Sequence, residues 1–189
     1  DTRHLLAEDY AYAIKRMGVR QNHSPILDSM KSYIVGLETY SNTITQIAKK
    51  KKAQGEVLDL RGYDISGVKV VDTHTLVIEI KGKYPQFLYW LTMNFFAPIP
   101  WEADLFYQQK GLVAKNLTLN WYPVGTGPYY LAENNPNKQM RLVKNPNFHD
   151  EVYPASDHED AGKKLPFIDE VIYALEKESI PLWNKFLQG

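Results

Sequence analysis

Histidine and carboxylate side chains are the residues here that could most readily hold a metal ion or move a proton. The five histidines are scattered along the chain, and no two are spaced to share one face of a helix: His4, His23, His74, His149 and His158. The one acidic cluster comprises Asp150, Glu151, Asp157, His158, Glu159 and Asp160. It lacks the glycine-centred, twelve-residue spacing of a calcium loop. We therefore predict an acidic surface loop there and no metal site.

Motifs for catalysis or cofactor binding are equally absent from the sequence. Gly125-Thr126-Gly127 resembles the start of a phosphate-binding loop, but a third glycine and a following lysine are missing. No Gly-x-Ser-x-Gly nucleophile motif occurs. The adjacent carboxylates Glu8 and Asp9 stand where a helix would begin, which is the ordinary place for acidic side chains. We predict no catalytic residue, no cofactor and no enzymatic activity.

Charge and composition exclude several classes of protein. The chain has 22 basic and 22 acidic residues, so its net charge is zero, and a strongly basic nucleic-acid-binding face is not expected. There is no cysteine, which excludes disulfides and thiolate metal sites. The one charge run, Lys49–Lys52, has two interpretations: a solvated helix end, or a site for an anion or membrane surface. The aromatic residues could form a core, which their general tendency to be buried favours, or a ligand-facing surface.

Periodicity predicts a mixed α+β organisation in the first part of the chain. Apolar spacing predicts helices over Glu8–Met17, Ile26 to about Tyr40, Ile44–Lys52, Gln86–Met93 and Trp101–Gln109. Two β-branched runs around a short polar turn predict a hairpin of Val68–Val71 with Thr75–Ile80. Prolines predict extended backbone over Phe95–Pro100.

A stretch rich in glycine and proline, Pro123–Pro128, divides this part from the rest. It predicts a change of chain direction, with the glycines serving backbone shape and close packing. Beyond it we expect a second hairpin, a long loop, a strand and a helix: Tyr129–Glu133 with Gln139–Lys144, His149–Lys164, Glu170–Leu175 and Ile180–Leu187.

Six blocks of sequence, taken together and in order, resemble the large extracellular solute-binding proteins that serve ABC importers of oligopeptides, dipeptides and nickel. The blocks are Leu6–Arg16 with its Ala-Glu-Asp core, Gly67–Leu76, Phe96–Pro100, Pro123–Tyr129 with its Gly-Thr-Gly-Pro-Tyr core, Lys144–Phe148 and Leu165–Val171. Two features depart from the family pattern. Leu6 stands where a capping threonine is common, and His149–Lys164 is longer than the usual connection.

The resemblance implies an α/β (α+β) fold that is a fragment of a type II periplasmic-binding-protein-like clamshell. Residues 1–124 would form the small α+β domain of the first lobe. Residues 125–189 would begin that lobe's mixed sheet, with Gly125, Thr126, Gly127 and Pro128 as the crossing between them. Because family members are several hundred residues long, we expect this chain to be an internal portion of a longer protein.

The function implied by the resemblance is that of the substrate-binding component of an ABC importer. Its partners would be a peptide or other small solute and an ABC permease in the inner membrane, with no nucleic acid. Its location would be periplasmic, or extracellular and membrane-anchored. The segments that lie towards the cleft in the family correspond here to Ser24, Pro25, Ile26, Met93, Asn94 and Phe95, which are therefore ligand-binding candidates. Arg20, the cationic residue nearest to these segments, is a further candidate as an anchor for an anion. Two alternatives stay open, a secreted hydrolase with an aromatic cleft and an interaction domain using Phe87–Phe96.

Overall fold

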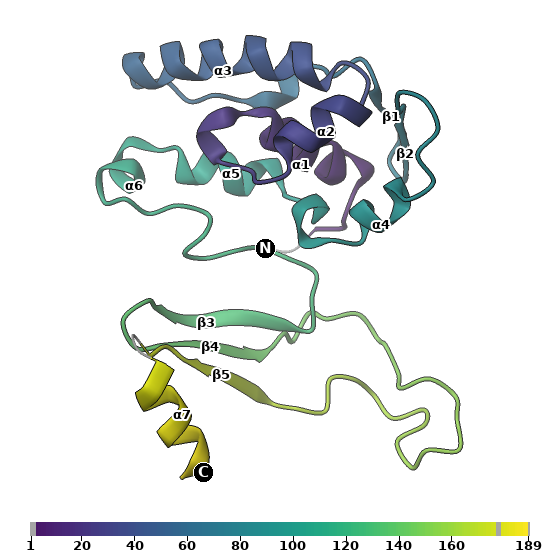
Figure 1. Ribbon diagram of the computed structural model, residues 1–189, viewed down its shortest axis with the longest axis vertical. Helices are drawn as coiled ribbons and strands as arrows, with labels where there is room; N and C mark the ends of the chain where they lie inside the picture. The colour runs from purple at the N-terminus through teal and green to yellow at the C-terminus, as the bar shows by residue number, and fades with distance from the viewer. Residues whose placement is uncertain (1–2, 177–178, 189) are drawn as a thin grey trace. The chain divides into compact units, whose positions relative to one another are not determined.

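The computed structural model describes residues 3–176 and 179–188. The chain separates into two compact units, Asp1–Leu119 (unit 1) and Asn120–Gly189 (unit 2). The boundary therefore falls shortly before the Pro123–Pro128 stretch, at which the sequence predicts the division. Unit 1 is mostly helical with one hairpin, and unit 2 contains a three-stranded sheet and one helix (Figure 1). The mixed α+β class predicted from the sequence is confirmed.

The first helix, α1 (Ala7–Gly18), forms the centre of unit 1. Its apolar positions follow helical spacing, and Tyr12 and Ile14 are completely enclosed. Leu6 offers no side-chain cap, but its N–H donates to the Asp9 carboxylate at 2.9 Å, which is half of a capping box. The helix predicted over Glu8–Met17 is thus confirmed, and Asp9 supplies part of the capping that Leu6 lacks.

The single helix predicted from Ile26 to Tyr40 is wrong. Two helices occupy this region, α2 (Leu27–Tyr33) and α3 (Leu37–Gln54), after a short 3-10 turn, η1 (Arg20–Asn22). Gly36 separates them with a φ of 78°, a left-handed conformation that interrupts a helix. Ile34 leaves the helix and forms an antiparallel bridge with Ile80. Pairing with a distant strand residue therefore overrides the local helical pattern.

Helix α3 also absorbs the separate helix predicted over Ile44–Lys52. It runs without interruption to Gln54 and ends at Gly55, whose φ is 65°. Leu37, Tyr40 and Ile44 on its inner face are buried, while its outer face is polar. A second 3-10 turn, η2 (Leu60–Gly62), follows.

The predicted hairpin is confirmed as β1 (Val68–Asp72) and β2 (Thr75–Ile78), an antiparallel pair with Val68 opposite Ile78. Gly67, just before β1, is held between two neighbouring segments. Its carbonyl accepts from the N–H of Glu79 at 2.7 Å, and its own N–H donates to the Val35 carbonyl at 3.1 Å. A Cβ at Gly67 would lie 2.5 Å from that Val35 oxygen, so only glycine fits.

Short helices complete unit 1: α4 (Phe87–Leu91), α5 (Trp101–Tyr107) and α6 (Lys110–Ala114), with a 3-10 turn η3 (Asn94–Phe96) after α4. The first two agree with prediction, although α4 is shorter than expected, and α6 was not predicted. The extended stretch expected from Phe95 is wrong at its start, because η3 includes Phe95 and Phe96; the backbone becomes extended only at Ala97. The buried core of unit 1 joins α1, α2 and α3 to η2, β1, α4 and η3.

Unit 2 contains β3 (Tyr129–Asn135), β4 (Gln139–Lys144) and β5 (Glu170–Ala174) in one antiparallel sheet of that order. The predicted hairpin and third strand are confirmed, and α7 (Ser179–Leu187) matches the last predicted helix. The described strands are all antiparallel, so they do not display the mixed character expected of the larger sheet. As predicted, His149–Lys164 is a long, largely exposed connection, closed by a bridge between Val152 and Lys164.

Candidate binding site

The first group of predicted ligand residues lies between α1 and α2. Arg20 opens η1 and is exposed, and its backbone N–H donates to Thr45 Oγ1 of α3 at 3.3 Å. Ser24 is half-buried, Pro25 is exposed, and Ile26 is buried in the core of unit 1. Arg20 and Pro25 are therefore open to a ligand, whereas Ile26 contributes mainly to packing.

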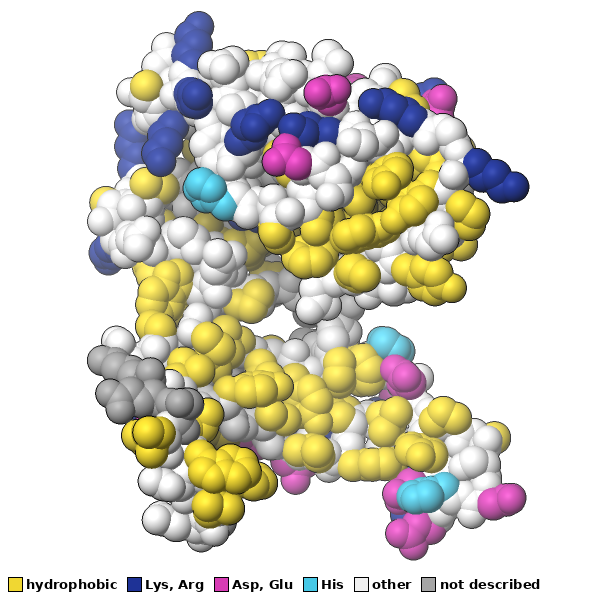
Figure 2. All heavy atoms as spheres, viewed as in Figure 1, with side chains coloured by type: hydrophobic (Ala, Val, Ile, Leu, Met, Phe, Trp, Pro, Cys, Tyr) yellow, Lys and Arg dark blue, Asp and Glu magenta, His cyan; other side chains and the backbone are white. Residues whose placement is uncertain are grey.

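The second group, Met93, Asn94 and Phe95, lies on and before η3 and is exposed. Leu88 and Tyr89 of α4 are still more exposed, at 70% and 69%. We call these five residues the α4 patch. Hydrophobic side chains gather around the position of α4 on the visible face of unit 1 (Figures 1 and 2). An exposed apolar group of this kind is typical of a ligand or partner surface.

Helix α1 supports both groups. It contacts both η1 and η3, and η1 also packs on α3 and η3 on α4. The two groups thus share one supporting helix within unit 1.

The Gly125–Pro128 segment lies in unit 2, directly before β3. The carbonyls of Gly127 and Pro128 accept hydrogen bonds from Asn145, at 3.0 Å from its side chain and 2.8 Å from its backbone. A Cβ at Gly125 would meet open space, and the nearest atom to one at Gly127 would be 4.0 Å away. Neither φ is positive. The expectation that these glycines serve close packing or a special backbone shape is wrong, because the carbonyls, which any residue has, make the contacts.

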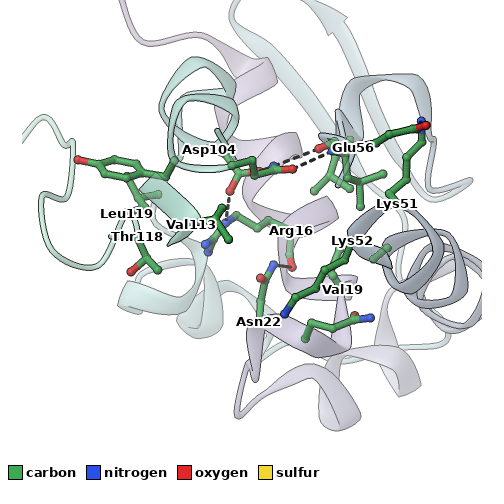
Figure 3. A pocket seen from close by; sticks show the side chains of 16 residues that line it. Arg16, Val19, Asn22, Lys51, Lys52, Glu56, Asp104, Val113, Thr118 and Leu119 are labelled. Carbon is green, nitrogen blue, oxygen red and sulfur yellow. Dashed lines mark hydrogen bonds and ion pairs between the residues drawn. The ribbon is translucent and has the colours of Figure 1, made fainter. Parts of the chain in front are cut away.

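A pocket of about 330 Å³ lies in unit 1 where the end of α1 and η1 meet α3, α5 and α6; we call it the Arg16 pocket (Figure 3). Its lining is Arg16, Val19, Gln21, Asn22, Ala48, Lys51, Lys52, Glu56, Leu58, Leu60, Asp104, Tyr107, Gln108, Val113, Thr118 and Leu119. None of these residues was among the predicted ligand residues. The only hint in the sequence was the lysine run, which supplies Lys51 and Lys52.

Asp104 organises the polar wall of the Arg16 pocket. Its carboxylate accepts hydrogen bonds from Tyr12 Oη at 2.9 Å, Arg16 Nε at 2.8 Å and Gln108 Nε2 at 3.1 Å. Burial, and then the nearby Asp104 charge, raise the pKa of the Tyr12 hydroxyl well above its usual range. Because Tyr12 and Arg16 belong to α1 and Asp104 belongs to α5, this carboxylate is a structural anchor that ties α1 to α5.

A second polar cluster, the Arg3 clamp, ties the first turn of α1 to α5. The Arg3 guanidinium donates to both oxygens of the buried Asp9, at 2.9 and 2.6 Å, and to both oxygens of Glu102, at 2.7 and 2.8 Å. Burial acts to raise the pKa of Asp9, but hydrogen bonds from Arg3 and Leu6 outweigh it, and the net pKa is lowered. Glu102 also has a lowered pKa, caused mainly by its hydrogen bonds to Arg3.

A second hollow, of about 440 Å³, lies beside α3 and is rich in hydroxyl groups. It is lined by Gly36, Thr39, Tyr40, Thr43, Ile44, Gly62, Tyr63, Asp64 and Ser66. Tyr40 is 6% exposed, and within the described residues its hydroxyl has no hydrogen-bond partner. A buried hydroxyl without a partner lowers the stability of the fold.

No histidine is among the residues that line the two pockets of unit 1. Thr73 Oγ1 lies 2.9 Å from His74 Nδ1, but this pair occupies an exposed turn of the hairpin. His149 and His158 pair with Glu151 and Asp160 in the long loop of unit 2. Within residues 3–176 and 179–188, no three His, Cys, Asp or Glu side chains are grouped so that they could hold a metal ion. No helix in the same ranges is both long and apolar enough to span a membrane.

Comparison with known protein families gives a match over the complete chain. The model of bacterial extracellular solute-binding proteins, family 5, middle part, matches residues 1–189. Among curated proteins, no sequence matches the chain.

Solved structures resemble the fold. The periplasmic oligopeptide-binding protein OppAIV of Borrelia burgdorferi aligns with a TM-score of 0.64 and 21% identity, over 97% of this chain and 30% of its own. The substrate-binding domain of a Bacillus anthracis oligopeptide ABC transporter gives 0.63 and 18%, over 98% and 29%. OppA of Burkholderia pseudomallei gives 0.63 and 15%, over 98% and 30%. The chain therefore spans about 30% of the length of these proteins.

Proposed function

Because this chain belongs to the bacterial extracellular solute-binding proteins of family 5, as the sequence resemblance predicted, we propose that it is part of the substrate-binding component of an ABC importer. The complete protein would capture a peptide-like solute in a two-lobed cleft and deliver it to a permease in the membrane. The observation that carries this proposal is the family match over all 189 residues. Structures of similar fold include an oligopeptide-binding protein and the substrate-binding domain of an oligopeptide ABC transporter, which supports a peptide as the solute.

The contribution of unit 1 to such a cleft would come from its exposed candidate residues. Phe95 and Met93 present apolar side chains, and Asn94 adds an amide that can donate and accept hydrogen bonds. Arg20 offers an exposed guanidinium for a carboxylate. Peptides are held largely through main-chain hydrogen bonds and charged ends, so this set suits a peptide-binding wall.

The proposed role is binding without catalysis. Two carboxylate–cation contacts of unit 1, the Arg3 clamp and the Arg16–Asp104 pair, tie helices together. The Thr73–His74 contact lies in an exposed turn that lines neither pocket. We also propose that the protein acts outside the cytoplasmic membrane, in the periplasm or anchored at the membrane's outer surface, in keeping with the extracellular description of its family.

Isothermal titration calorimetry of the complete protein against di- to pentapeptides, an oligosaccharide and Ni²⁺ tests this function. We expect saturable binding of at least one peptide and none of the other two. Phe95→Ala should weaken peptide binding several-fold, because it removes an apolar contact. Phe167→Ala, which truncates a similarly exposed phenylalanine of unit 2, is the matched control and should not change the affinity. Binding of sugar or nickel with no peptide binding would refute the proposal.

The α4 patch also favours a second candidate, a protein-interaction surface, since 70% and 69% exposure of Leu88 and Tyr89 is high for apolar residues. A protection experiment with a bound peptide distinguishes the two roles. If the patch belongs to the solute cleft, a saturating peptide protects Tyr89 and Met93 from chemical oxidation. If it binds a protein partner, peptide leaves their oxidation rates unchanged.

A further inference from the structure

Two lysines of the run Lys49–Lys52 line the Arg16 pocket: Lys51, which is half-buried, and Lys52, which is exposed at its edge. Lys49 and Lys50 are exposed on the last turns of α3 and do not line the pocket, whereas Lys51 and Lys52 do. Figure 3 shows Lys51 turned to Glu56, and their side chains form an ion pair at 2.6 Å. The Lys52 side chain takes a different direction in the same view.

The formal charges around the Arg16 pocket do not cancel. Three cationic side chains, Arg16, Lys51 and Lys52, face two carboxylates, Asp104 and Glu56, which leaves one positive charge. Arg16 pairs with Asp104 at 2.8 Å, and Lys51 pairs with Glu56. Lys52 has no carboxylate partner within the residues that the structure describes. The unbalanced positive charge of the pocket therefore lies on Lys52.

The remainder of the pocket is largely apolar. Val19, Leu58, Leu60 and Leu119 are buried side chains of its lining, and Val113 of α6 adds an exposed apolar side chain. A volume of about 330 Å³ is at the small end of the range for small-molecule pockets. Apolar walls suit a ligand with an apolar body, and one unpaired cation suits a ligand with a single negative charge.

We propose that the Arg16 pocket binds a small amphiphilic carboxylate, with its apolar body against Leu58, Leu60 and Leu119 and its carboxylate on Lys52. This site is distinct from the proposed solute contacts, because the pocket includes neither Arg20 nor any residue of the α4 patch. In Figure 1, α6, which lines the pocket, and α4 lie at opposite ends of unit 1. The ligand and a peptide that contacts the α4 patch would therefore occupy different parts of unit 1.

NMR titration of the ¹⁵N-labelled 189-residue chain with 4-phenylbutyrate tests the site. We expect saturable shifts at the amides of Val113, Leu119 and Lys52, and at least tenfold weaker shifts at the same concentration of the neutral analogue 4-phenylbutan-1-ol. Lys52→Gln should weaken 4-phenylbutyrate binding about tenfold, since it removes one charge-assisted contact. Lys50→Gln, a neighbour in the same run that does not line the pocket, should leave the affinity unchanged.

Val113→Asp provides a second variant that does not threaten folding, because Val113 is 55% exposed. Its carboxylate should abolish binding through repulsion and loss of apolar contact. The proposal is overturned if 4-phenylbutyrate produces no shifts at the pocket residues, if the neutral alcohol binds equally well, or if Lys50→Gln weakens binding as much as Lys52→Gln. It is also overturned if inorganic phosphate alone reproduces the shifts, because the site would then be a plain anion site.

Discussion

Replacing tyrosine by phenylalanine should have opposite effects on the free energy of unfolding at Tyr12 and at Tyr40. Both side chains are buried in unit 1, at 0% and 6% exposure. The Tyr12 hydroxyl donates to Asp104 at 2.9 Å, whereas the Tyr40 hydroxyl has no partner in the described part of the chain. Replacing each with phenylalanine removes only the oxygen and leaves the ring in place.

The magnitudes follow from these two environments. A buried polar group without a hydrogen bond costs about 1–3 kcal/mol, so Tyr40→Phe should raise the free energy of unfolding by roughly 1 kcal/mol. A hydrogen bond to a charged acceptor contributes about 1.5–3 kcal/mol, so Tyr12→Phe should lower it by about 2 kcal/mol. Asp104 keeps its bonds from Arg16 and Gln108, which limits the loss. For a chain of this size, 1 kcal/mol corresponds to about 2–4 °C in Tm.

Urea unfolding with an unchanged m-value measures both differences, and hydrogen exchange of the α1 amides assigns them to unit 1. The dependence of stability on alkaline pH gives an independent check of the environment of Tyr40. Burial, followed by the Asp64 charge, raises the pKa of Tyr40 in the folded state, so above about pH 10, where the unfolded chain ionises this hydroxyl first, the free energy of unfolding falls as pH rises. Tyr40→Phe should reduce that alkaline loss. A destabilised Tyr40→Phe variant would refute the reasoning, because it would mean that the hydroxyl has a partner in solution.

Three further predictions concern backbone fit, pH and the segment before β3. Gly67→Ala should lower the free energy of unfolding by about 2–3 kcal/mol, measured with urea, because the added Cβ overlaps neighbouring backbone atoms. The control Gly111→Ala, whose Cβ meets nothing within 4 Å, should raise it by about 0.5 kcal/mol. Equal effects of the two substitutions would contradict the close packing at Gly67. Because the pKa of Asp9 is lowered in the folded state, its carboxylate stabilises the fold fully above its ordinary pKa of about 3.8, and this stabilisation is lost as pH falls further. Asp9→Asn should therefore have a lower free energy of unfolding at pH 7, and that free energy should fall less steeply in acid. An acid dependence equal to that of the unaltered protein would count against the Arg3 clamp. Gly125→Ala should change Tm by less than about 2 °C, and a larger loss would restore a special role for that glycine.

Local patterns in the sequence are sufficient for the elements whose partners are close in the chain. The hairpins β1–β2 and β3–β4 and helix α1 each carry their periodicity and turn residues within a short window, so their prediction succeeds. The helix over Ile26–Tyr40 fails because its interruption depends on Ile34 pairing with Ile80, a contact that no local pattern contains.

The candidate site is less predictable from the sequence than the fold, because its residues also meet through contacts between distant parts of the chain. The Arg16 pocket depends on Arg16 meeting Asp104, 88 positions later, and on Leu58 meeting Gln108. The family resemblance supplied the identity of the fold, and the family match confirms it. Which residues contact the solute stays a prediction, and of the predicted residues Arg20, Pro25, Met93, Asn94 and Phe95 are exposed.

The Arg3 clamp has a consequence for the kinetics of folding. Arg3 and Glu102 are 99 positions apart, so their ion pair can form only after the intervening chain has closed into a loop. Contacts that form late are absent from the transition state, and their loss accelerates unfolding without slowing folding. The clamp would therefore govern the lifetime of folded unit 1, while the speed of its assembly would depend on local contacts such as the β1–β2 hairpin.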